Sequence, residues 1–104
     1  MIDWARVEDL RTATGEADFC EIVDLFLEEV EEALAALVDH GGAEDLRERL
    51  HFLKGSALNL GFADLSEMCA EGETTGRADI PGIRACFDRC RREFFAGVGH
   101  LDGA

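Results

Sequence analysis

Apolar side chains recur at helical spacing along most of the chain. In the longest such segment they recur at i, i+3, i+4 and i+7 spacing: Phe19, Ile22, Val23, Phe26, Val30, Ala33, Leu34 and Leu37. The same spacing predicts helices over residues 3–12, 17–39, 43–60, 62–75 and 80–96. No segment shows the strict alternation of a half-buried strand. We therefore expect an all-α fold, with residues 1–104 forming a single domain. Its predicted architecture is an antiparallel four-helix bundle with an additional short N-terminal helix.

Glycine marks several of the predicted helix ends. Gly15 interrupts the pattern after the first helix, and Gly41 with Gly42 closes the longest one. Glycine suits such positions because it adopts the left-handed conformation at little steric cost. Asp79 is expected to cap the last helix. The tail over residues 97–104 is expected to be frayed.

The helix predicted over residues 43–60 has two different faces. Its apolar stripe on a helical wheel consists of Leu46, Leu50, Leu53, Ala57 and Leu60. His51 lies roughly 140° from that stripe and Gly55 roughly 180°, so both are expected to face water. Glycine inside a helix costs about 1 kcal/mol relative to alanine. On an outer face the remaining explanation is clearance, because without a side chain at Gly55 another molecule can approach the imidazole.

The outer face also carries residues suited to phosphoryl chemistry. Arg47, Lys54 and Leu58 share one stripe with His51. A neutral imidazole is a good nucleophile near pH 7. Lys54, one turn away, would stabilise a dianionic phosphoryl group, with Arg47 helping more loosely. Such transfer depends mainly on positioning and electrostatics, so few residues are required.

Features that would let the chain use ATP by itself are missing. The sequence has no glycine-rich phosphate loop, no kinase signature and no carboxylate cluster arranged to hold magnesium. We therefore expect the phosphoryl donor, the metal and the second nucleophile to come from a partner.

Charge and composition narrow the choice of partner. The formal net charge is −13, from 23 acidic and 10 basic residues. Such a surface repels phosphate backbones and anionic lipid, so nucleic acid and membranes are not expected partners. No apolar run is long enough to span a bilayer, and the N-terminus lacks a secretory signal. We expect a cytoplasmic monomer.

The four cysteines give no sign of a metal or redox site. Cys20, Cys69, Cys86 and Cys90 form no Cys-x-x-Cys pair and show no zinc-finger spacing. We expect buried, reduced thiols that act as small apolar side chains.

One segment closely resembles the signature of histidine-containing phosphotransfer (HPt) domains: His51-Phe52-Leu53-Lys54-Gly55-Ser56-Ala57, followed by Asn59-Leu60-Gly61. The resemblance extends over most of the chain and includes the acidic helix around Phe26-Leu27-Glu28-Glu29. It implies a phosphocarrier without its own ATP site. His51 would accept a phosphoryl group from an aspartyl phosphate on a receiver domain and relay it to another receiver.

The resemblance also assigns roles and partners. It carries Lys54 over as the residue that stabilises the phosphate, Gly55 as the clearance position and Gly61 as a structural position near the helix end. The implied partners are response-regulator receiver domains and a hybrid histidine kinase. The receiver would hold Mg²⁺, and this chain would bind no metal or other cofactor. Nothing resembles a kinase ATP-binding domain or a fused receiver, so a stand-alone carrier is expected.

Receiver docking is expected on the surface around His51. The candidate contact residues are Arg47, Phe52, Leu58, Val7, Leu10 and Arg11. Trp4 is assigned to core packing instead.

Two other functions stay open at this point. One is a helical adaptor or dimerisation module that uses the same face without being phosphorylated. The other is a metal-binding bundle that uses His51 with a carboxylate or thiol. The cysteines fall on the wrong side of their segments for that, and no Glu-x-x-His pair faces His51.

Overall fold

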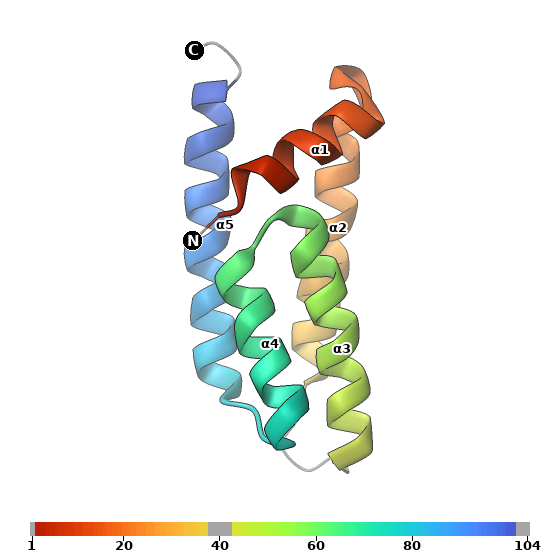
Figure 1. Ribbon diagram of the computed structural model, residues 1–104, viewed down its shortest axis with the longest axis vertical. Helices are drawn as coiled ribbons and strands as arrows, with labels where there is room; N and C mark the ends of the chain where they lie inside the picture. Colours follow the sequence, from red (N-terminus) through yellow and green to blue (C-terminus); the bar gives the residue numbers. More distant parts are fainter. Residues whose placement is uncertain (1, 38–42, 102–104) are drawn as a thin grey trace.

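The computed structural model describes residues 2–37 and 43–101. Within them it has five α-helices: α1 (Trp4–Thr14), α2 (Glu16–Ala36), α3 (Ala43–Leu60), α4 (Ala63–Thr75) and α5 (Ile80–Leu101). Helices α2 to α5 run antiparallel, each packing on the next, and α1 crosses one end of this bundle (Figure 1). The only strand-like feature in the described residues is an isolated bridge between Ile2 and Phe62. The predicted all-α bundle with an N-terminal helix is confirmed.

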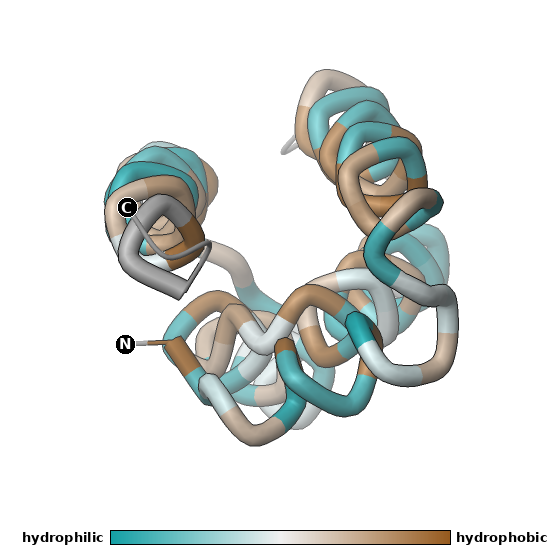
Figure 2. The backbone as a smooth tube through the Cα atoms, turned by 90° about the horizontal axis from the view of Figure 1, so that it is seen from above, coloured by the Kyte–Doolittle hydropathy of each residue, from teal (hydrophilic) through white to brown (hydrophobic). Residues whose placement is uncertain are grey.

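Every helix of the bundle is amphipathic. Apolar and polar segments alternate along the backbones of α2 and α5, which stand clear of the other helices in Figure 2. The apolar side of α3 lies at the centre of the core, where Leu50, Leu53, Ala57 and Leu60 are all fully buried. Burying one leucine side chain contributes about 1.5–3 kcal/mol. This stripe therefore holds α3 in one rotational orientation and determines which of its residues face water.

An aromatic contact joins α1 to α5. Trp4 stacks on Phe94, with ring centroids 6.2 Å apart, and its indole also lies against Gly97. Trp4 therefore packs on the core, as predicted. Helix α5 continues past this contact to Leu101. The prediction of a frayed tail from Gly97 is wrong as far as Leu101.

A single residue separates α1 from α2. Gly15 has φ of +83° and donates its N–H to the carbonyl of Arg11 at 2.9 Å. One glycine is enough for the turn, so α1 continues to Thr14 and α2 begins at Glu16. The sequence predicted a longer interruption, from residue 13 to residue 16.

Two further helix ends bear on the predictions. Helix α2 ends at Ala36 with Leu37 in extended conformation, so it is shorter than predicted. The predicted Gly41–Gly42 cap lies outside the described residues. Asp79 caps α5 as predicted, because its Oδ1 accepts the N–H of Gly82 at 3.1 Å.

Three of the four cysteines are buried thiols. Cys69, Cys86 and Cys90 lie in the core. Burial raises the pKa of the Cys69 thiol to about 12 and the pKa of Cys90 to about 11, so both stay protonated at neutral pH. The prediction is wrong for Cys20, which is exposed. It follows the buried Phe19 directly, and one step along a helix turns a side chain by about 100°.

Candidate functional site

His51 stands on the outer face of α3, opposite the buried leucines. Its side chain is 73% exposed, in the direction that the helical wheel predicted. Gly55 follows on the next turn, and a side chain there would meet no neighbouring atom within 4 Å. The space beside the imidazole is therefore open to an incoming molecule. Ser56, next to this glycine, is buried.

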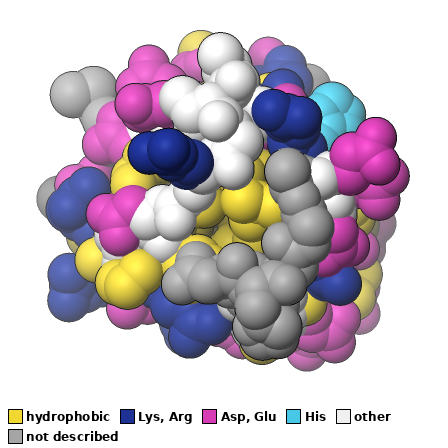
Figure 3. Space-filling model, turned by 90° about the horizontal axis from the view of Figure 1, so that it is seen from below, with side chains coloured by type: hydrophobic (Ala, Val, Ile, Leu, Met, Phe, Trp, Pro, Cys, Tyr) yellow, Lys and Arg dark blue, Asp and Glu magenta, His cyan; other side chains and the backbone are white. Residues whose placement is uncertain are grey.

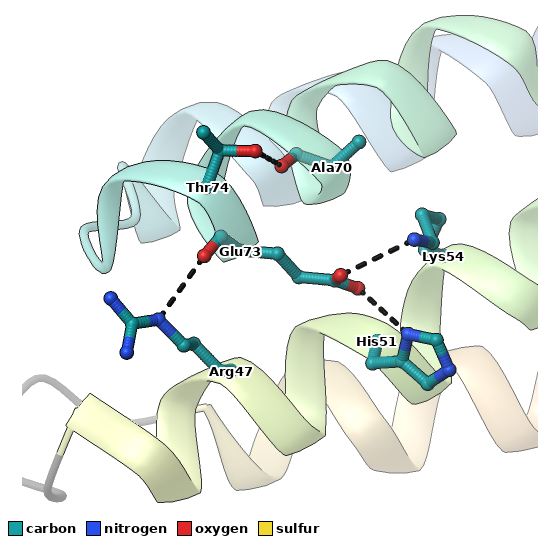
Figure 4. A network of polar contacts seen from close by, with 6 residues as sticks. All are labelled: Arg47, His51, Lys54, Ala70, Glu73 and Thr74. Carbon is teal, nitrogen blue, oxygen red and sulfur yellow. Dashed lines mark hydrogen bonds and ion pairs between the residues drawn. The ribbon is translucent and has the colours of Figure 1, made fainter.

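A carboxylate from α4 lies between His51 and Lys54 (Figure 4). Glu73 places Oε1 3.2 Å from Nδ1 of His51 and Oε2 3.2 Å from Nζ of Lys54. The Glu73 and Lys54 side chains are mostly shielded, at 22% and 27% exposed. The three side chains form a charged cluster, the His51–Lys54–Glu73 cluster, in which the imidazole is outermost.

The surroundings of Glu73 determine which imidazole nitrogen is free. Its Oε1 is shielded from solvent and has no hydrogen-bond donor in the described part of the chain other than the ring it faces. Leaving a shielded carboxylate oxygen without a donor is costly. This favours the imidazole tautomer with the proton on Nδ1, directed at Oε1. Nε2 then carries the free lone pair.

Close packing of α4 on α3 brings Glu73 to the imidazole. Gly72 lies so near Leu50 that a Cβ atom would come within 2.6 Å of its Cδ1. Arg47 also joins α3 to α4. Its Nε donates a hydrogen bond to the backbone carbonyl of Glu73 at 3.1 Å. The Arg47 guanidinium also lies against Gly76, the left-handed C-cap of α4. Arg47 is thus directed to the end of α4, away from the imidazole, contrary to its expected role beside the phosphate (Figure 4).

Comparison with known families agrees with this geometry. The family model described as the Hpt domain matches residues 21–94, which run from α2 through most of α5 and include the whole His51–Lys54–Glu73 cluster. The chain belongs to the Hpt domain family. No curated protein and no solved structure matches it. Hpt domains are phosphocarriers of two-component phosphorelays that carry the phosphoryl group on histidine and interact with receiver domains and kinases.

The first helix of this Hpt domain protein presents the docking residues that the sequence suggested only in part. Val7 is fully buried, so its prediction as a contact residue is wrong. Leu10 packs partly against the core. Arg11 is only 17% exposed and pairs with Glu16 at 2.9 Å. Every third or fourth residue of α1 must face the bundle, and the sequence alone did not distinguish its sides.

The two apolar candidates on α3 are exposed but lie on different sides. Leu58 is 43% exposed on the stripe that contains His51. Its backbone carbonyl accepts a hydrogen bond from Nε of Arg6 at 3.2 Å, which brings a cation from α1 to this surface. Phe52 is 52% exposed and lines a groove on the α2 side with Glu32 and Arg49. Leu58 therefore belongs to the surface around His51, whereas Phe52 lies on a different side of α3.

Glu73 is the residue of the cluster that sequence reasoning missed. The helical pattern of residues 62–75 places it at the edge of the apolar side, a position that does not by itself predict a contact with His51. Its pairing with His51 depends on how α4 is rotated and shifted against α3. The adjacent Gly72 is a weak signal of close helix packing, because glycine is unfavourable inside a helix.

The surface charges, possible metal ligands and helix hydrophobicity were also compared with the predictions. Seen from the end of the bundle where α3 begins, acidic and basic side chains are interspersed, with apolar atoms between them (Figure 3). The described residues contain no group of three or more His, Cys, Asp or Glu side chains placed to hold a metal ion. Among these residues, no helix has the length and apolar character that crossing a membrane requires.

Proposed function

We propose that this Hpt domain relays phosphoryl groups between two receiver domains, with His51 as the acceptor. The observation that carries the proposal is the exposed imidazole whose Nδ1 faces Glu73, which leaves Nε2 free beside the open space at Gly55. A receiver can therefore bring an aspartyl phosphate to Nε2 without a side chain in its path. The Mg²⁺ needed for transfer would be held by the receiver.

Lys54 is proposed to stabilise the transferred group. Its ammonium has three N–H donors, and the contact with Glu73 at 3.2 Å uses one of them. The remaining donors can reach the oxygens of a phosphoryl group on the neighbouring imidazole. Such charge-assisted hydrogen bonds are about twice as strong as neutral ones.

Labelling of a single histidine tests the relay. The purified protein is incubated with a radiolabelled phospho-receiver and Mg²⁺, and the label is then tested for stability in acid and base. We expect an acid-labile, base-stable label that is absent from His51→Gln and unchanged in the control His100→Gln. A second, unlabelled receiver should then remove the label.

Several outcomes would contradict the relay. Label that persists in His51→Gln would place the acceptor elsewhere. Stable binding of the receiver with no transfer of label would instead support the adaptor function. A label that no second receiver can remove would indicate a terminal acceptor rather than a relay.

A further inference from the structure

We propose that two copies of this chain pair through the face formed by α2 and α5, in a two-fold symmetric dimer. The acidic α2 of each copy then lies on the basic α5 of the other. This pairing leaves both His51 side chains accessible, because each lies on the α3–α4 side of the bundle, next to Glu73. The inference goes beyond the proposed function and departs from the monomer expected from the sequence.

Helices α2 and α5 carry opposite charges. Helix α2 has eight acidic residues and no lysine or arginine, whereas α5 has four arginines and two acidic residues. On a chain with a net charge of −13, α5 is therefore a basic surface. Both helices stand clear of the others, so their outer sides are free to meet a second copy (Figure 2). A face with one acidic and one basic half is complementary to itself under a two-fold axis, as an isologous dimer requires.

Each half of this face carries a large apolar side chain among charges that lack partners. Leu25 on α2 and Phe95 on α5 are both about half exposed. Phe95 lines a groove together with Arg92. Arg92, Glu28 and Glu32 are exposed and have no ion-pair partner within the described part of the chain. A second copy with the same face can bury both apolar side chains and pair these charges.

The ion pair between Glu31 and Arg91 fixes the register of the two antiparallel helices. Oε1 of Glu31 lies 3.1 Å from Nη1 of Arg91, so the two residues stand at similar heights along the bundle. At roughly 1.5 Å per residue, Leu25 lies about 9 Å from that level toward the α1 end, and Phe95 about 6 Å. A two-fold axis parallel to the bundle preserves height. Leu25 of one copy therefore comes level with Phe95 of the other.

The same register places Arg92 opposite two acidic residues. Arg92 lies about 1.5 Å above the level of the ion pair, Glu28 about 4.5 Å above it and Glu32 about 1.5 Å below it. Leu25, Glu28 and Glu32 follow one another at i, i+3 and i+7, so they form one stripe along α2. In the dimer, Arg92 of each copy faces Glu28 and Glu32 of the other, beside the contact between Leu25 and Phe95.

The size and charge of the molecule suit a weak dimer. The molecule measures 45 × 20 × 20 Å, so its long face is comparable to the roughly 800 Å² per partner that a standard interface buries. Two chains with a net charge of −13 repel each other at long range. Screening at 0.1 M ionic strength acts over about 10 Å, so it weakens this repulsion more than the close contacts. Association should be stronger in about 150 mM NaCl than in about 10 mM.

Sedimentation velocity with two charge-reversed variants tests the pairing. One variant is Arg92→Glu, and the other combines Glu28→Arg with Glu32→Arg. We expect the wild type to dimerise between about 5 μM and about 500 μM, the range of a weak complex. Each variant alone should dimerise at least about tenfold more weakly, because like charges then face each other. An equimolar mixture should recover the wild-type dissociation constant within about threefold, because both contacts of the mixed dimer again join opposite charges.

Matched controls separate the interface from general effects of charge. Arg89→Glu makes the same charge change at an exposed position of α5 outside the groove and should dimerise like the wild type. Leu25→Gln should weaken the dimer by about fivefold or more, because an apolar contact is lost. All samples contain a reductant, since Cys20 is an exposed thiol. Circular dichroism checks that each variant folds.

The outcomes separate this inference from the proposed function. A wild type that stays monomeric at about 500 μM would overturn the dimer. A mixture that associates no better than its two components would overturn the pairing of α2 with α5. Oligomers that keep growing with concentration would indicate open, head-to-tail association and contradict a closed dimer. Failure of a phospho-receiver to label His51 would overturn the proposed function and leave the dimer intact.

Discussion

His51, Lys54 and Gly55 lie within five residues, yet each has a different environment. The imidazole is mostly exposed, the ammonium is held by a carboxylate of α4, and the glycine has empty space above it. The rotation of α3 explains the first and third environments. The neighbouring helix explains the second. Under the proposed function His51 is the nucleophile, the positive charge of Lys54 stabilises the product, and Gly55 leaves space for the partner.

Replacing Gly55 by glutamine should separate stability from function. Glutamine has a much higher helix propensity, so the free energy of unfolding should rise by up to about 1 kcal/mol in urea denaturation. The new side chain occupies the space next to the imidazole, and we expect phosphoryl transfer from a receiver to slow by about tenfold or more. Gly55→Ala should give the same gain in stability with a smaller loss of rate. Unchanged transfer in the glutamine variant would remove the clearance argument.

The turn between α3 and α4 fixes the position of the first helix. Gly61 has φ of +74°, and its carbonyl accepts the N–H of Asp3 at 2.7 Å. A side chain at this position would come within 2.6 Å of the carbonyl oxygen of Asp3. The Hpt model does not reach α1, since its match begins at residue 21. This contact and the Trp4–Phe94 stack therefore dock the N-terminal segment on residues of the matched region.

Gly61→Ala should destabilise the protein, in contrast to the same change at Gly55. A left-handed conformation costs alanine about 1–2 kcal/mol, and the collision with Asp3 adds to this. We expect a loss of about 2 kcal/mol or more in the free energy of unfolding. Fluorescence of Trp4, the single tryptophan, should show release of α1. An unchanged unfolding midpoint would mean that the turn relaxes without moving the N-terminal segment.

The whole molecule carries a large excess of negative charge. Its formal net charge is −13, and the outer side of α2 contributes a run of exposed acids that includes Glu28, Glu29 and Glu32. Opposing this, ion pairs such as Arg91–Glu31, at 3.1 Å, join α5 to α2. Exposed ion pairs of this kind contribute little, typically below about 1 kcal/mol. Mutual repulsion should therefore dominate the response of the fold to salt.

Added salt should stabilise this protein. Screening acts over about 10 Å at 0.1 M ionic strength, so raising NaCl from about 10 mM to about 200 mM weakens repulsion between the acidic residues. We expect the thermal midpoint, followed by circular dichroism, to rise over this range. A Glu28→Gln, Glu32→Gln variant with less charge should show a smaller rise. A midpoint that falls with salt would indicate that the ion pairs outweigh the net repulsion.

The helices, the inward face of α3 and the outward position of His51 could all be predicted from the amino-acid sequence. These follow from local periodicity, because burying a regular apolar stripe leaves only one orientation for an amphipathic helix. The motif around His51 also indicated the family, which the match over residues 21–94 established. Each of these features depends on residues a few positions apart in one segment.

Which residues of other helices join the site depends on how the helices pack. Glu73 reaches His51 because Gly72 lets α4 approach Leu50, whereas Arg47 is drawn to the end of α4 and Val7 is turned into the core. Such contacts depend on the rotation and offset of one helix against another. Helix α4 carries four acidic residues, and only its packing against α3 shows that Glu73 is the one that faces the imidazole.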